Sequence, residues 1–142
     1  MKKTPPSEKL EIPIRRFVTK RLIGVNRDAT IQEAASRMVE FKISSIAVVD
    51  HEDVIGIVTD TDFKKKALAE GRSPEEAVHK IMTSNPVTAD INTTVRHVLE
   101  LMYKEKVKHI LVSEDKKITG ITTLKELEEL DLHGLETLIA RE

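Results

Sequence analysis

An internal repeat runs through most of the chain and limits what it can fold into. Adding 64 to each position from Ile14 to Phe63 carries the first half of the sequence onto the second half without a gap. The matched pairs include Thr19 with Thr83 and Gly56 with Gly120. The period exceeds the roughly 20 to 50 residues of solenoid and propeller units, so each copy has room for several strands and helices. The sequence therefore predicts two copies of one small α/β unit.

The size of the repeat indicates how the two copies associate. A unit of about 60 residues buries only about 60% of the surface of its unfolded chain, so a single copy would be marginally stable. We therefore expect the copies to share one core around a pseudo-twofold axis, with function in the symmetric clefts between them. A chain of 142 residues, 39% of them hydrophobic, is long enough for one compact domain of two lobes.

Composition excludes several classes of partner. Lys and Arg total 23 against 24 Asp and Glu, and the net charge of −1 gives no general attraction to nucleic acid or an anionic membrane. Three Phe, one Tyr and no Trp offer few rings for base stacking. No apolar run reaches the roughly 20 residues of a membrane-spanning helix. Cysteine is absent, which suits a reducing compartment. We expect a cytoplasmic protein without nucleic acid or membrane partners.

Pattern and composition divide the chain into four segments. Residues 1–11 contain Pro5-Pro6, lack periodicity and predict a flexible N-terminal tail. The first repeat is expected at 12–71 and the second at 72–131. Residues 132–142 predict a C-terminal helical segment, with an amphipathic helix from Leu132 to Ala140.

Each repeat is predicted to have the element order β-α-β-β-α. In the first repeat, Thr30 and Glu33 form a capping box that begins a helix ending near Lys42. A further helix is expected to begin at 73–76, where Ser73 would be the N-cap and Pro74 the first helical residue. The remaining expected elements are strands at 22–25, 46–50, 54–59, 86–89, 109–113 and 118–122, and helices at 60–69, 94–106 and 123–130.

Hydroxyl and carboxylate side chains gather where the third strand of the first repeat enters a helix. This stretch reads Thr59-Asp60-Thr61-Asp62. A carboxylate can accept hydrogen bonds from both hydroxyls of a ribose, and the amides at a helix start attract phosphate. The alternative is that these residues only cap the helix. The residues themselves leave both interpretations open.

Two repeats in register, each with a Gly-apolar-x-Thr-x-x-acid strand exit, resemble the tandem cystathionine β-synthase (CBS) domain pair, or Bateman module. The resemblance covers Ile12 to about Leu130. It implies a fold of the α/β (α+β) class, with two β-α-β-β-α repeats related by pseudo-twofold symmetry. Members of the family bind AMP, ADP, ATP or S-adenosylmethionine and regulate enzymes, channels or transporters.

The resemblance implies a first ligand-binding cleft that takes residues from both repeats. Thr59 and Asp62 would hold the ribose, Val87 would pack on the adenine, and Lys108 and His109 would bind phosphate. Charge-assisted hydrogen bonds of roughly 1.5–3 kcal/mol each would favour an adenine nucleotide, AMP before ADP or ATP. The full set is Ile57, Thr59, Thr61, Asp62, Val87, Lys108, His109 and Lys125.

The symmetric second cleft is expected to be weaker. Glu126 replaces the aspartate there, and two serines replace the lysine and histidine, so a phosphate would lose its cations. We expect this cleft to be empty or to take a less charged adenosyl compound. Alternatively, its acid and threonine only begin a helix. The residues are Ile23, Ser44, Ser45, Thr123 and Glu126.

The resulting prediction is a regulatory, ligand-sensing CBS pair and not an enzyme. The expected ligand is a regulatory adenine nucleotide, with no other cofactor, no catalytic residues and no metal site. Binding would favour one angle between the lobes, which an unknown regulated protein would recognise. Two alternatives stay open: an assembly module that needs no metabolite, and a sensor of S-adenosylmethionine. A nucleotide hydrolase lacks support because no metal-binding carboxylate cluster is evident.

Other features receive structural interpretations. The resemblance implies a homodimer built on exposed helices, to which four apolar side chains could contribute unless they close the core. The run Lys64-Lys65-Lys66 is interpreted as a solvated helix face. The five histidines lack metal-ligand spacing. The four apolar side chains are Leu127, Leu130, Leu132 and Leu135.

Overall fold

The computed structural model describes residues 10–128, which form two compact units. Unit 2 runs from Leu22 to Pro86, and unit 1 combines residues 10–21 with residues 87–128. Unit 2 thus holds most of the first repeat together with the start of the second. Unit 1 holds most of the second repeat together with the start of the first. Each unit is described by itself below.

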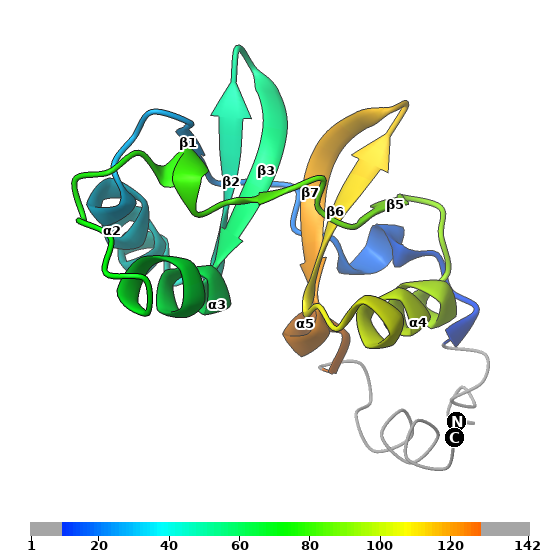
Figure 1. Ribbon diagram of the computed structural model, residues 1–142. Helices are drawn as coiled ribbons and strands as arrows, with labels where there is room; N and C mark the ends of the chain where they lie inside the picture. Colours follow the sequence, from blue (N-terminus) through cyan, green and yellow to red (C-terminus); the bar gives the residue numbers. More distant parts are fainter. Residues whose placement is uncertain (1–9, 129–142) are drawn as a thin grey trace. The chain divides into compact units, whose positions relative to one another are not determined.

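Unit 2 contains a four-stranded sheet covered by helices. The first pair of strands is parallel, and the other two pairs are antiparallel. The helices lie on one side of the β2–β3 hairpin (Figure 1). In sheet order the strands are β1 (Gly24–Asn26), β2 (Ser45–Asp50), β3 (Asp53–Thr59) and β4 (Thr83–Ser84). The helices are α2 (Ile31–Phe41), α3 (Asp60–Asp62), the π-helix η2 (Phe63–Leu68) and the 3₁₀ turn η3 (Val78–Lys80).

Unit 1 repeats this plan with three strands. Its first pair is parallel and its second pair antiparallel. Figure 1 shows the blue η1 beside α4, although they are far apart in the sequence. The strands are β5 (Thr88–Asp90), β6 (His109–Glu114) and β7 (Lys117–Thr123). The helices are η1 (Ile14–Phe17), α4 (Val95–Glu105) and α5 (Leu124–Glu128). The predicted β-α-β-β-α order is confirmed in both repeats.

The two repeats use the same local devices at equivalent positions. The predicted capping box is present: Thr30 Oγ1 accepts the Glu33 amide at 3.0 Å, and the Glu33 carboxylate accepts the Thr30 amide at 3.0 Å. Helices α2 and α4 both end at a left-handed residue, Lys42 and its counterpart Lys106. The hairpin turns at 51–52 and 115–116 also have positive φ. The two repeats therefore share their backbone geometry at these positions.

Each unit has its own apolar core. In unit 2, Ile31, Ala34 and Met38 of α2 pack on the sheet. In unit 1, Leu127 is 1% exposed and lies in the core, whereas Leu130, Leu132 and Leu135 fall outside the described residues. Leu10, placed in the tail by the sequence, is also buried there. In the part of the chain that the structure describes, no helix is long and apolar enough to cross a membrane.

The prediction of a helix that begins at 73–76 is wrong. The Ser73 amide does donate to the Glu76 carboxylate at 2.8 Å, as a helix cap would. However, the Gln32 amide donates to the Pro74 carbonyl, and the Ile31 amide donates to the Glu76 carbonyl. These two carbonyls therefore accept the first amides of α2 and are not used in a helix that begins at 73–76. The hydrogen bond from the Ser73 amide lowers the pKa of the Glu76 carboxyl.

Other predictions need adjustment or fall outside the described residues. The helix predicted at 60–69 is α-helical only from Asp60 to Asp62 and continues as the π-helix η2. There the Ala69 amide bonds to the Lys64 carbonyl, five residues earlier, at 2.9 Å. Strand β4 was not predicted. Residues 1–9 and the expected helix at 132–140 lie outside the described range.

A short segment pairs closely with a glycine-containing strand in each unit. In unit 2, Thr83 lies opposite Ile57, beside Gly56. In unit 1, Thr19 and Ile121 exchange backbone hydrogen bonds of 2.9 and 3.1 Å. A Cβ atom on Gly56 would lie 2.9 Å from the Thr83 carbonyl oxygen, and one on Gly120 would lie 2.7 Å from the Thr19 oxygen. Both glycines are therefore required by the approach of the segment.

We expect Gly56→Ala and Gly120→Ala each to lower the free energy of unfolding by about 1–3 kcal/mol, since a methyl group would overpack the pairing. Urea denaturation measures this. Gly71→Asn is the matched control because Gly71 has open space around it and a φ of 69°, which asparagine tolerates. Wild-type stability of both alanine variants would contradict the close pairing.

Candidate functional site

The candidate site in unit 2 begins where β3 enters α3. Thr59 is the N-cap residue, and its amide donates to Asp62 Oδ2 at 2.9 Å. The Thr59 hydroxyl lies 3.3 Å from the same oxygen. The helix cap, one of the two interpretations that the sequence allowed for these residues, is therefore present. It uses one oxygen of the carboxylate.

The second oxygen of this carboxylate faces donors from two other elements. Thr83 of β4 places its hydroxyl 3.3 Å from Asp62 Oδ1. Lys66 of η2 places its Nζ 3.1 Å from the same oxygen. The Asp62 side chain is only 9% exposed. A buried charge of this kind needs paired and hydrogen-bonded neighbours, which the lysine and the hydroxyls supply.

The cluster has the chemistry to hold a diol. An ionised carboxylate offers about four acceptor positions on its two oxygens. The Thr59 amide is fixed by the backbone, but the hydroxyl contacts of Thr59 and Thr83 at 3.3 Å are long, and hydroxyl groups rotate. Ligand hydroxyls can take over these acceptor positions while the cap stays intact. Capping and ligand binding are therefore compatible at Asp62.

Unit 1 has a related arrangement around Glu126. Its carboxylate accepts the Thr19 hydroxyl at 2.9 Å, and its amide donates to Thr123 Oγ1 at 3.2 Å. Thr19 and Glu126 are the repeat equivalents of Thr83 and Asp62. Each unit therefore brings a threonine hydroxyl from the other repeat onto its acid.

The other predicted residues of unit 2 lie on or beside the same sheet. Ile57 is 6% exposed and lies next to β4, whereas Thr61 is exposed in the first turn of α3. Ser44 is exposed, and its carbonyl accepts the Asp60 amide at 3.3 Å. Ser45 is 8% exposed on β2. Ile23, half-buried, packs against the core of this unit.

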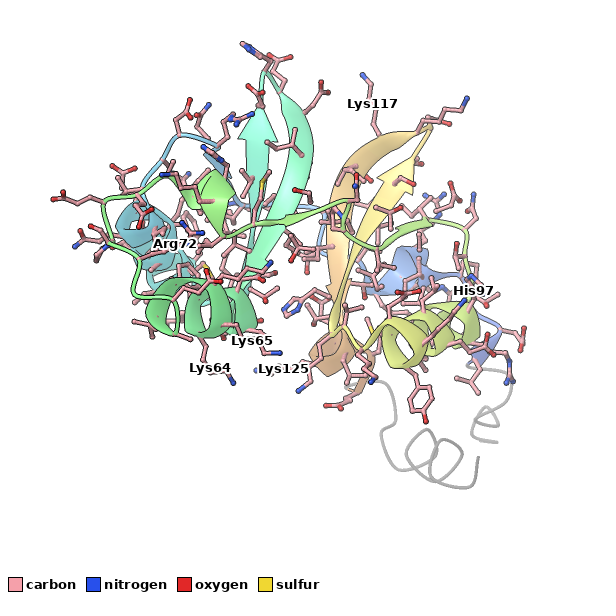
Figure 2. All side chains as sticks on the ribbon, in the orientation of Figure 1. Lys64, Lys65, Arg72, His97, Lys117 and Lys125 are labelled. Carbon is pink, nitrogen blue, oxygen red and sulfur yellow. The ribbon has the colours of Figure 1, made fainter. Side chains whose placement is uncertain are left out.

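The predicted residues of unit 1 gather at one end of its sheet. Lys108 is exposed, and its carbonyl accepts the Leu124 amide at 2.9 Å. His109 is half-buried and lies opposite Thr123. Lys125 is exposed at the start of α5 (Figure 2). The remaining residue, Val87, is half-buried and packs against the core of unit 1. The residues assigned to each predicted cleft divide between the two units, and the complete sites stay predictions.

Two residues at Asp62 were missed from the sequence. Thr83 could have been found, because its repeat partner Thr19 is also a threonine in a matching position. Lys66 was grouped with its neighbours as a solvated helix face. That interpretation fits Lys64 and Lys65, which are exposed and project from their helix (Figure 2), whereas Lys66 also forms an ion pair with Asp62 that the sequence did not indicate. Within residues 10–128, no group of His, Asp and Glu could hold a metal ion.

The fold and the site define a class: tandem α+β repeats in which an acid and a threonine meet where a strand enters a helix. The chain belongs to the CBS-domain family. The CBS domain profile matches residues 14–69 and 78–132. Protein YlbB of Bacillus subtilis is 35% identical over 99 residues, which cover 68% of this chain and 67% of YlbB.

Solved structures share the fold. A conserved protein from Pyrococcus horikoshii is 37% identical, with a TM-score of 0.83 over 86% of this chain and 93% of that one. The CBS domain pair of protein MJ0100 is 28% identical, with a TM-score of 0.76 over 84% of this chain and 98% of that one. That structure is a complex with 5′-methylthioadenosine and S-adenosyl-L-methionine.

We expect Thr59→Ala and Asp62→Ala to lower the free energy of unfolding by about 1 kcal/mol and about 2 kcal/mol respectively. The first loses a side chain of the cap, and the second loses the cap together with the partner of Lys66. Chemical denaturation followed by circular dichroism gives both values. Asp60→Ala, which alters an exposed neighbour, is the control. Identical stabilities for all three variants would contradict a structural role for the cluster.

Proposed function

We propose that this chain is a regulatory CBS pair that senses an adenosine-containing ligand, with an adenine nucleotide as the physiological signal. The observation that carries the proposal is the buried carboxylate of Asp62, which has threonine hydroxyls on both sides and a lysine on one oxygen. Its rotatable hydroxyl partners suit exchange for the 2′ and 3′ hydroxyls of a ribose.

The MJ0100 complex supports an adenosyl ligand. Both 5′-methylthioadenosine and S-adenosyl-L-methionine contain adenosine, and the two CBS pairs are 28% identical over 84% of this chain and 98% of that one. That complex equally keeps a sensor of S-adenosylmethionine as the alternative. The charge of the group at the 5′ position separates the two candidates, because a nucleotide is anionic there and a sulfonium is cationic.

Cations in unit 1 are proposed to select the phosphate. Lys108 and Lys125 are exposed, and His109 is half-buried beside them in sequence. Charge-assisted hydrogen bonds from such groups are about twice as strong as neutral ones. We therefore propose AMP as the first candidate, with ADP and ATP as alternatives. Ligand binding would shift the population of conformations of the chain, and a regulated protein would recognise the favoured one.

Isothermal titration with AMP, ADP, ATP, S-adenosylmethionine and adenosine tests the proposal. We expect micromolar binding of a nucleotide at about one per chain, equivalent to about 8 kcal/mol. Asp62→Asn should weaken adenosine and AMP alike by at least about tenfold, because both use the ribose contact. Lys108→Ala should weaken AMP but spare adenosine.

Asp60→Asn serves as the matched control, since it removes an exposed carboxylate from the same helical turn. Its affinities should equal those of the wild type. Equal losses for adenosine and AMP in Lys108→Ala would contradict the assignment of that lysine to phosphate. Absence of binding by every compound would favour the assembly module that needs no metabolite.

We also propose that the chain forms a homodimer through its helical faces. In unit 2, α2 and η2 border an open groove of about 500 Å³ with an apolar lining that includes Met38, Phe63 and Ala67. Val39 on its rim is 78% exposed. Its repeat equivalent on α4, Tyr103, is 86% exposed. Exposed apolar side chains at equivalent helix positions suit a self-complementary surface for a second copy.

Val39→Glu should convert the dimer to a monomer, because it places a charge on the rim of the proposed apolar contact. Light scattering coupled to size exclusion measures the mass. Glu40→Lys, one residue along the same helix, is the control for a change of charge on an exposed position. A wild-type chain that is monomeric at high concentration would contradict the proposal.

A further inference from the structure

We propose that Lys66 determines which ligand charge the Asp62 site accepts. By pairing with the carboxylate, it favours an anionic adenine nucleotide over a cationic adenosyl sulfonium. This inference rests on the proposed function, namely that the ribose of an adenosyl ligand binds at Asp62. It assigns a specificity-determining role to a residue that would not need to touch the ribose.

Two contacts hold the ammonium group at the acid. Lys66 Nζ lies 3.1 Å from Asp62 Oδ1 and 3.4 Å from Thr83 Oγ1. Lys66 stands four residues after Asp62, so the first turn of the helix brings it back over the carboxylate. Its side chain is 40% exposed, so the lysine is not enclosed by the protein. The lysine is therefore both fixed at the acid and accessible.

The charge of the site follows from this pairing. A buried carboxylate alone would carry −1, repel phosphate and attract a sulfonium. The pair of Asp62 and Lys66 is close to neutral, so the acid can accept ribose hydroxyls without opposing an anion at the 5′ position. For two charges about 8 Å apart in a partly solvated site, such as Lys66 and the 5′ group of a ligand, one unit of charge changes the affinity for the ligand by roughly threefold to tenfold. AMP and S-adenosylmethionine differ by several units of charge near the ribose.

The second repeat lacks this lysine. Its acid, Glu126, is followed four residues later by Leu130, which lies outside the described residues. The two repeats therefore differ at a position where charge on the ligand matters. The inferred preference for anions belongs to the acid of unit 2 only.

Lys66→Met tests the inference, because methionine keeps much of the side-chain length and removes the charge. Titrations with adenosine, AMP and S-adenosylmethionine give three affinities for each protein. We expect AMP to weaken by about tenfold, adenosine to change by less than about threefold, and S-adenosylmethionine to bind equally or more tightly. Lys65→Met, from the same lysine run and exposed, should behave as the wild type.

The ratio of AMP to S-adenosylmethionine affinity is the decisive quantity. A fall in that ratio supports the inference, whereas an equal change for all three ligands overturns it and leaves Lys66 as a residue that only positions Asp62. Lys66→Arg should keep the wild-type ratio. Lys66→Gln, which can still donate to the carboxylate, repeats the test if the methionine variant unfolds. A wild-type chain that binds none of the three compounds would instead refute the proposed function.

Discussion

The close pairing of a short segment with a glycine-containing strand is the constraint on which each unit depends. Thr83 lies against β3 beside Gly56, and Thr19 lies against β7 beside Gly120. Each segment comes from the start of one repeat and completes the unit formed by the other. These segments also carry the threonines that contact the acids. The backbone pairing that completes each unit therefore also places a threonine hydroxyl at the candidate site.

The acid of unit 2 shows how structure and recognition can use one side chain. Asp62 is buried, and burial of a carboxylate is costly unless every oxygen has donors. The Thr59 amide satisfies one oxygen, and the ammonium of Lys66 satisfies the other. The hydroxyl contacts are longer and adjustable. A ligand can therefore replace the weak partners while the strong ones keep the helix start in place.

The local sequence pattern predicted those elements that depend on interactions between residues close in sequence. The capping box of Thr30 and Glu33 and the apolar runs of β2 and β3 depend on nearby residues, so the sequence predicted them. The rest depends on contacts distant in sequence. The conformation at 73–76 depends on α2, because the first amides of that helix donate hydrogen bonds to the carbonyls of this turn. Strand β4 has two residues and no periodicity of its own, and the contact of Lys66 depends on how a helix turn lies over Asp62.

Because each unit is completed by a segment from the other repeat, this arrangement also determines the kinetic order of folding. A single repeat would have to obtain its missing segment from a second molecule, in a step whose rate depends on protein concentration. In the tandem chain, both segments are covalently attached to their acceptors, which gives them a high effective concentration. Completion of each unit thus becomes a unimolecular process. A chain divided between its repeats would regain the concentration dependence that the fusion removes.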